Sequence, residues 1–233
     1  MTTTTSTPYP LAAPRASTST RDLAELIFGF AAIMTILWLP TRQQVIFGPI
    51  ALVMPLTLVV LRPPSAYALG LTWRGLVSSL WMLPAAATVA FAGVELARFA
   101  GTFHPLYNAD LAHVGGYVVW TFYQQFLLQD FFMPRLTRLL TSDLAIGAGA
   151  LFFALAHLPN LPLTIATLAW GAASCALFRR YRSLYILGLA QGLLGLTFAV
   201  CIPDTMLHHM RVGLGYSHYH PIQGSFQGLA ARN

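Results

Sequence analysis

Charged residues are scarce in this chain of 233 residues, and lysine is absent altogether. Asp, Glu, Lys and Arg together make up 9% of the sequence, while hydrophobic residues make up 56%. A typical soluble domain carries about 25% charged residues. These proportions exclude a disordered protein, a nucleic-acid arm and an ordinary soluble enzyme, and they predict a polytopic membrane protein. Without lysine, Schiff-base chemistry on a lysine is excluded as well.

Cysteine is also rare, with two residues, Cys175 and Cys201, inside or at the edge of apolar segments. No CxxC pair occurs, so neither a disulfide framework nor a cysteine-rich metal site is indicated. We interpret both cysteines as small apolar residues that fill space in helices.

Seven apolar runs are long enough, or nearly so, to cross a bilayer, which takes about 20 helical residues. They cover residues 23–40, 44–61, 76–97, 112–133, 144–158, 161–178 and 184–202. The predicted fold is therefore an all-α, polytopic membrane bundle of about seven transmembrane helices. We divide the chain into a disordered N-terminal tail (1–20), a membrane domain (21–203) and a C-terminal tail (204–233).

The arginines predict the orientation, because cytoplasmic loops carry an excess of basic residues. With seven spans and the N-terminus inside, nine arginines fall on the inner side and four on the outer side. The inner ones are Arg15, Arg21, Arg62, Arg74, Arg135, Arg138, Arg179, Arg180 and Arg182; the outer ones are Arg42, Arg98, Arg211 and Arg232. We expect a cytoplasmic N-terminus, a bacterial cytoplasmic membrane as the location, the lipid bilayer as the surroundings and no nucleic-acid partner.

Polar side chains inside a span are costly, so they indicate where function lies. The fourth run holds three amides and a carboxylate within seven residues: Gln124, Gln125, Gln129 and Asp130. The simplest interpretation is hydrogen bonding between helices, with Asp130 paired to Arg135 or Arg138. Glu95, near the end of the third run, is expected to pair with Arg98.

Two further polar residues lie in apolar runs, His157 and Gln191. At 1.5 Å per residue, Gln124, Gln191 and His157 lie roughly 13, 12 and 21 Å from the inner ends of their spans. These comparable depths predict that the glutamines of the fourth run, His157 and Gln191 face one buried polar pocket.

Three motifs in residues 115–200 resemble those of the CPBP family of intramembrane proteases, the CAAX-prenyl-protease and bacteriocin-processing (Abi) proteins. The stretch from Gln124-Gln125 through Gln129-Asp130 to Pro134-Arg135-Leu136 is similar to the family's first motif, Glu-Glu-x-x-x-Arg-Gly. Phe153-x-x-x-His157 resembles the second, Phe-x-x-x-His, and Gln191-Gly-Leu-Leu-Gly195 falls where the third, His-x-x-x-Asn/Asp, would stand. The resemblance implies a helical bundle whose cavity holds the catalytic residues.

In that family the glutamate pair activates a water molecule, and the histidines and the Asn or Asp assist. Among these positions only His157 keeps its residue type. Amides stand at 124, 125, 129 and 191, an aspartate at 130 and a glycine at 195. Because an amide cannot take a proton near neutral pH, the water-activating base is missing. We expect no catalytic residues here, and we interpret Gln124, Gln125, Gln129, His157, Gln191 and Gly195 as a degenerate site.

The C-terminal tail gathers four histidines within 13 residues: His208, His209, His218 and His220. Imidazoles can bind zinc, copper or haem iron, but this spacing matches no metal motif. We expect no cofactor and interpret the segment as an interfacial tail of Tyr and His. Gly213 and Gly215 argue against a continued helix there.

The sequence therefore predicts a catalytically silent, CPBP-like membrane protein that binds or scaffolds a membrane partner, a peptide or a hydrophobic ligand. A first alternative is a divergent, active intramembrane peptidase that uses His157 with Asp130 or Glu95. A second alternative is a pigment- or haem-binding subunit of a membrane complex, with His157 or the tail histidines as ligands.

Overall fold

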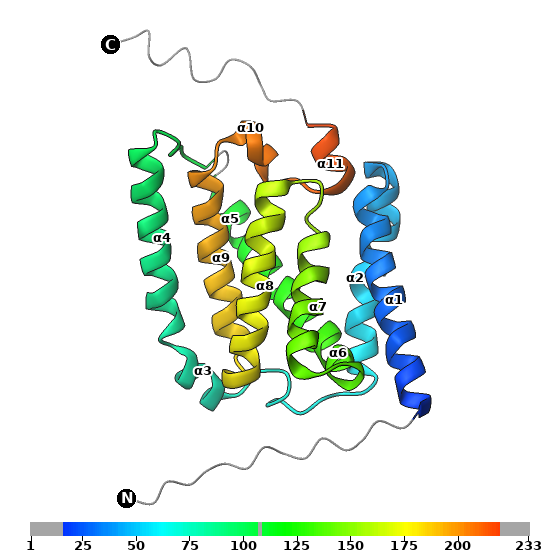
Figure 1. Ribbon diagram of the computed structural model, residues 1–233. Helices are drawn as coiled ribbons and strands as arrows, with labels where there is room; N and C mark the ends of the chain where they lie inside the picture. Colours follow the sequence, from blue (N-terminus) through cyan, green and yellow to red (C-terminus); the bar gives the residue numbers. More distant parts are fainter. Residues whose placement is uncertain (1–15, 107–108, 220–233) are drawn as a thin grey trace, which may run out of the picture.

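The computed structural model describes residues 16–106 and 109–219, and within that part of the chain it contains helices and no strand (Figure 1). The elements are α1 (Ala16–Trp38), α2 (Thr41–Val60), α3 (Trp73–Ser79), α4 (Met82–Phe99), α5 (Leu111–Phe126), η1 (Leu127–Phe132), α6 (Met133–Leu139), α7 (Ser142–Leu155), α8 (Leu161–Tyr181), α9 (Leu184–Cys201), α10 (Asp204–Leu207), η2 (His208–Met210) and α11 (Gly213–Ser217). The predicted all-α bundle is confirmed.

Six of the seven apolar runs each fall in one continuous helical stretch with shifted ends, whereas the run 76–97 is divided between α3 and α4, so the single span expected there is corrected. Among the described residues, α2, α4, α8 and α9 are long and apolar enough to cross a membrane, and α7 is an apolar helix of 14 residues. Helix α1 begins at Ala16, inside the expected tail, while residues 1–15 lie outside the described part. The run expected to end at 133 continues through η1, a π-helix of six residues, and α6 to Leu139.

Side-chain caps set the starts of several helices. The Asn160 side-chain oxygen accepts a hydrogen bond from the Leu163 backbone N–H at 3.3 Å and so begins α8. Ser183 caps α9 in the same way through the Ile186 N–H, at 3.4 Å. Such caps satisfy backbone donors that a helix start leaves unpaired. They fix the short connections between spans.

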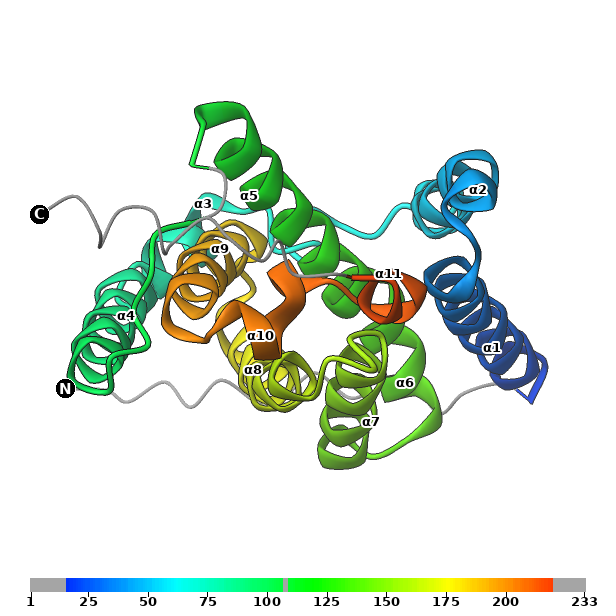
Figure 2. The same cartoon turned by 90° about the horizontal axis from the view of Figure 1, so that it is seen from above.

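The long helices run from one end of the bundle to the other, with α3 at one end and α10 and α11 at the opposite end (Figures 1 and 2). Helix α9 packs against α4 and α5, α8 packs against α7, and α1 packs against α2 and α6. The outer face of α2 exposes large apolar side chains, including Val45, Ile46 and Ile50. Such a face is suited to contact with hydrocarbon rather than water.

Ion pairs join α1 to α6 at one end of the bundle. Arg138 binds the buried carboxylate of Asp22 through two hydrogen bonds, at 2.6 and 2.7 Å. Arg135 pairs with Glu25 at 2.6 Å, and Arg62, just after α2, reaches the same carboxylate at 3.4 Å. These contacts hold the end of α6 beside the start of α1.

The expected pairing of Asp130 with Arg135 or Arg138 is wrong, because both arginines bind carboxylates of α1 instead. Asp130 lies in η1, is 5% exposed, and its Oδ2 has no hydrogen-bond partner among the described residues. The expected Glu95–Arg98 pair is confirmed, with a distance of 2.8 Å.

Candidate functional site

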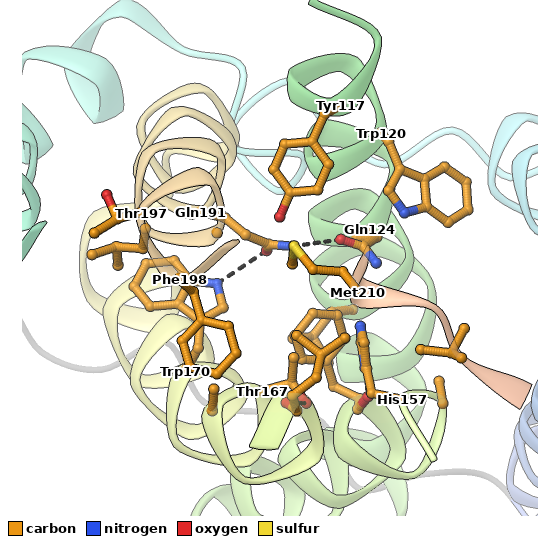
Figure 3. Close-up of a pocket in the computed structure, with 18 of the residues that line it drawn as sticks. Tyr117, Trp120, Gln124, His157, Thr167, Trp170, Gln191, Thr197, Phe198 and Met210 are labelled. Carbon is orange, nitrogen blue, oxygen red and sulfur yellow. Dashed lines mark hydrogen bonds between the residues drawn. The ribbon is translucent and has the colours of Figure 1, made fainter. Parts of the chain in front are cut away.

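A cavity of about 780 Å³ lies inside the bundle. Its walls come from α1, α2, α4, α5, η1, α7, α8 and α9, and the segment after α10 contributes Met210 and Val212. Gln124, His157, Gln191 and Gly195, all named from the sequence, line this space (Figure 3). Most of the remaining lining is aliphatic or aromatic.

The side chain of Gln191 is the centre of an amide network between α5, α8 and α9. Its Nε2 donates to Gln124 Oε1 at 2.6 Å. Its Oε1 accepts two hydrogen bonds, from Gln125 Nε2 at 2.6 Å and from the Trp170 indole N–H at 3.0 Å. The amides of Gln124 and Gln191 therefore bind each other, and Gln191 also binds the Trp170 indole. These hydrogen bonds fix the orientation of both amides (Figure 3).

Two of the expected site residues lie behind the cavity wall. Gln125 is 0% exposed and Gln129 1% exposed, and neither lines the cavity. Gln129 Nε2 donates to Gln125 Oε1 at 3.1 Å, as expected for residues four apart on one helix face. The expectation that all the glutamines face the pocket is thus corrected: Gln125 and Gln129 support the two amides that do.

His157 lies just after α7, where the chain turns toward α8. Its Nδ1 lies 2.6 Å from the Phe153 carbonyl oxygen. A carbonyl only accepts, so Nδ1 carries the proton and the neutral ring presents Nε2 as an acceptor. His157 is 8% exposed, and Nε2 has no hydrogen-bond partner among the described residues. The bond to Phe153 orients the imidazole.

Tyr117, on α5, is a site residue that the sequence reasoning missed. Its hydroxyl occupies the space beside Gly195, where a Cβ atom added to the glycine would overlap it. Gly195 follows Gln191 by one helical turn, so both face the same wall. The sequence does hold one indication of this role, because Tyr117 lies in an apolar run seven residues before Gln124. The hydroxyl of a tyrosine within such a run needs a polar partner or a cavity.

No acidic or basic residue other than His157 lines the cavity within the described part of the chain. Asp130 and Glu95, the carboxylates considered as bases, are both outside the lining. Glu95 is instead tied to Arg98 on the exposed surface. The polar surface of the cavity is therefore made of neutral groups.

The segment 204–217, which we call the strap, closes the end of the bundle opposite the ion pairs of α1 and α6 (Figures 1 and 2). Asn160 Nδ2 donates to the carbonyls of Leu207 and Arg211, at 2.7 and 3.1 Å. The Gly213 N–H donates to the Leu158 carbonyl at 2.7 Å. Contrary to expectation, a short helix, α11, follows at Gly213–Ser217. Gly213 begins it with φ of 55° where a side chain would overlap the Leu37 backbone.

The strap histidines His208 and His209 contact other residues of the strap and Tyr219, which follows it. His208 stacks on Tyr216, with ring centroids 4.0 Å apart. His209 Nε2 lies 3.2 Å from the Asp204 carboxylate, which also binds the Tyr219 hydroxyl. The pKa of His209 is lowered overall from its ordinary value, chiefly by burial and also by the nearby Arg211, His104 and His208. The Asp204 carboxylate acts in the opposite direction and raises it.

Among residues 16–106 and 109–219, no three His, Cys, Asp or Glu side chains gather in a group that could hold a metal ion. His218 is exposed beyond α11, and His220 lies outside the described residues. The four tail histidines considered from the sequence are thus not brought together with further ligand side chains in the described part of the chain.

A helical membrane bundle with a buried amide- and histidine-lined cavity is the class of protein that this architecture defines. The chain matches the sequence model of the family described as type II CAAX prenyl endopeptidase Rce1-like over residues 23–197. The protein belongs to that family. The match begins in α1, so it reaches far beyond the motifs of residues 115–200. No curated protein and no solved structure matches the chain.

Proposed function

We propose that the protein is a non-hydrolytic member of this family that holds a hydrophobic ligand in its cavity. The observation that carries the proposal is the mutual hydrogen bonding of Gln124, Gln191 and Gln125, which stand at positions where the family motifs have acids and a histidine. An amide has no basic site for a water proton near neutral pH. General base catalysis typically contributes about 10²–10⁴-fold in rate, and this lining offers no carboxylate for it.

Among the described residues that line the cavity, His157 is the one basic side chain, and its surroundings support a silent site. Its Nδ1 donates to a backbone carbonyl rather than to a carboxylate. In hydrolytic triads a carboxylate at that position stabilises the imidazolium that forms when histidine takes a proton. The two carboxylates considered from the sequence, Asp130 and Glu95, are not in the cavity lining. An imidazolium formed here would therefore lack a compensating charge.

The walls support a hydrophobic occupant. A volume of about 780 Å³ lies within the range of about 300–1,000 Å³ common for small-molecule pockets. Phe30, Leu52, Phe152 and Phe198 are among the apolar side chains around it. A lipid chain would bury its surface there; a peptide segment or membrane partner inserted into the cavity would use the same walls.

A paired substitution tests the silent site. Gln124→Glu with Gln191→His introduces the acid and the base that the family motifs carry, and cleavage of a prenylated peptide is measured in proteoliposomes. We expect no cleavage by the parent protein and measurable cleavage by the double variant. Gln43→Glu, at an exposed position of α2, is the matched control and should leave the parent's behaviour unchanged.

One result would contradict the silent site. If the parent cleaves the peptide and His157→Ala abolishes cleavage, the protein is an active peptidase and the proposal is wrong. Extraction of the purified protein and identification of the bound lipids test the binding half of the proposal. We expect a stoichiometric apolar molecule, and its displacement by Ala166→Phe, which adds bulk to the cavity wall.

A further inference from the structure

Most polar side chains of the cavity have their hydrogen bonds already satisfied by the protein. Thr167 donates to the Leu163 carbonyl at 2.8 Å and Thr197 to the Leu193 carbonyl at 2.9 Å. Gln191 Oε1 accepts two hydrogen bonds, from Gln125 and Trp170, and its Nε2 donates one to Gln124. Groups paired in this way have little left to offer a ligand.

Four polar groups of the cavity lining have no hydrogen-bond partner among the described residues: the Tyr117 hydroxyl, the Trp120 indole N–H, Gln124 Nε2 and His157 Nε2. The first three come from α5 and the fourth from the end of α7 across the cavity, and Met210 of the strap lies among them (Figure 3). These groups open onto the cavity rather than being enclosed by protein, so a ligand that fills the cavity can pair with them, and one that leaves them unpaired would cost about 1–3 kcal/mol for each group. These atoms are therefore the natural contact points for a ligand head group.

Their chemistry is complementary. Gln124 Nε2 can only donate, and the Tyr117 hydroxyl can donate or accept. His157 Nε2 can only accept, because the proton of the neutral ring lies on Nδ1, bonded to Phe153. A head group that uses both sides must accept from α5 and donate to His157.

The same lining excludes a charged head. No arginine, lysine or carboxylate lines the cavity among the described residues. A buried charge without a partner is strongly unfavourable. Phosphates, carboxylates and ammonium groups are disfavoured on this ground. Among neutral heads, an ether or a carbonyl accepts but cannot donate, whereas a hydroxyl does both.

We propose that the ligand of this cavity is a long-chain alcohol. Its hydroxyl accepts a hydrogen bond from Gln124 Nε2 or Tyr117 and donates one to His157 Nε2, and its chain lies against the apolar walls. This inference rests on the proposed ligand-holding function and names the chemical class of the ligand. No covalent step is involved.

Quenching of tryptophan fluorescence tests the inference, because Trp120 and Trp170 line the cavity. The full-length protein in lipid nanodiscs is titrated with four bromine-labelled C16 probes: an alcohol, its methyl ether, the alkane and the carboxylate. We expect the alcohol to bind about tenfold more tightly than the ether, the size expected for one hydrogen bond. The carboxylate should bind most weakly. Trp120→Phe with Trp170→Phe gives the background from the other tryptophans.

Variants then assign the preference to named atoms. His157→Phe removes the acceptor while keeping a ring, so the preference for alcohol over ether should vanish. His157→Gln restores an acceptor oxygen and should restore part of the preference. Tyr117→Phe should weaken the alcohol and the ether together. Tyr185→Phe, at a half-exposed position outside the lining, is the matched control and should change nothing.

The outcomes separate this inference from the proposed function. Equal binding of alcohol, ether and alkane would overturn the inference while leaving a hydrophobic cavity that holds ligands. Strongest binding of the carboxylate would overturn it too, because the head would then be charged. Quenching by none of the probes, with peptide cleavage by the parent protein, would overturn both.

Discussion

Gly195 and Tyr117 share one small volume in the cavity wall. The glycine has no side chain, and the tyrosine hydroxyl occupies the place that a Cβ atom would take. Position 195 corresponds to the Asn or Asp of the family's third motif. In this protein the Tyr117 hydroxyl of the neighbouring helix α5 occupies the space beside it. The polar group at that point belongs to a different residue, with a hydroxyl in place of an amide or an acid.

Gly195→Ala is therefore expected to lower the stability of the protein, because the added methyl group overlaps the Tyr117 hydroxyl unless the tyrosine ring moves from its packed position. Overpacking of this kind costs about 1–3 kcal/mol. Thermal unfolding of the purified protein measures the loss. Tyr117→Phe in the same background removes the hydroxyl and should recover part of it.

Gly147→Ala is the control for that substitution. A Cβ atom there meets nothing within 4 Å, so the variant should be as stable as the parent or slightly more stable. Equal melting temperatures for the Gly195→Ala and Gly147→Ala variants would contradict the shared-volume interpretation.

At the scale of elements, the strap contains three successive residues with left-handed backbone. His208, His209 and Met210 have φ values of 48°, 51° and 57°, and none of them is a glycine. Each such residue costs of order 1–3 kcal/mol and persists only where other contacts hold it. Here those contacts are the two hydrogen bonds from Asn160 and the Asp204–His209–Tyr219 group.

We expect the strap to loosen on acidification. The pKa of His209 is lowered from its ordinary value of 6.5 in the closed strap. A released strap, in which the histidine titrates near that ordinary value, takes up the proton more readily. Acidification through pH 6.5 and toward the lower pKa therefore favours release, whereas neutral and higher pH favours the closed strap.

A spin label at Gly215→Cys measures this, since a Cβ atom at that position meets nothing within 4 Å. Cys175 and Cys201 are replaced by alanine in the labelled protein. The mobile fraction should rise severalfold between about pH 7.5 and about pH 5.5, a range that spans histidine titration. In a His209→Gln background the rise should disappear. A label that becomes less mobile in acid would show that the sign is wrong.

The helices could be predicted from the sequence because each apolar run is a local property of the chain. Gln125 and Gln129 share one helix face for a similarly local reason, because they are four residues apart. The ion pairs Glu25–Arg135 and Asp22–Arg138 could not be predicted from the sequence, because their members are 110 and 116 residues apart. Closeness in sequence suggests that Asp130 pairs with Arg135 or Arg138. In the folded protein, both arginines instead bind carboxylates of α1.

At the scale of the whole molecule, the described arginines sort by end. Arg21, Arg62, Arg135 and Arg138 meet the carboxylates of α1 at one end. Arg179 and Arg180, in the last turn of α8, and Arg182, directly after it, lie at that same end of the bundle, and the strap lies at the other (Figure 1). The grouping that the positive-inside rule requires is therefore present, whichever side of the membrane it faces.

We expect the arginine-rich end to face the cytoplasm. Reporter fusions after Arg182 and after Arg211 check this, using one reporter active only in the cytoplasm and one active only outside it. The first fusion should report the cytoplasm and the second the outside. Both fusions reporting the same side would contradict the seven-span arrangement, and reversed signals would contradict the orientation.

The π-helix η1 sets the rotational phase between two networks on one continuous helix. Above it, Gln125 is bound to α9 through Gln191; below it, Arg135 is bound to α1 through Glu25. Removing one residue from Leu127–Phe132 would turn the two halves relative to each other by about 100°, the rotation per residue of an α-helix. The amides and the arginine could then no longer both meet their partners. The π-helix thus sets the rotation at which Gln125 faces α9 near the cavity while Arg135 faces α1 at the charged end of the bundle.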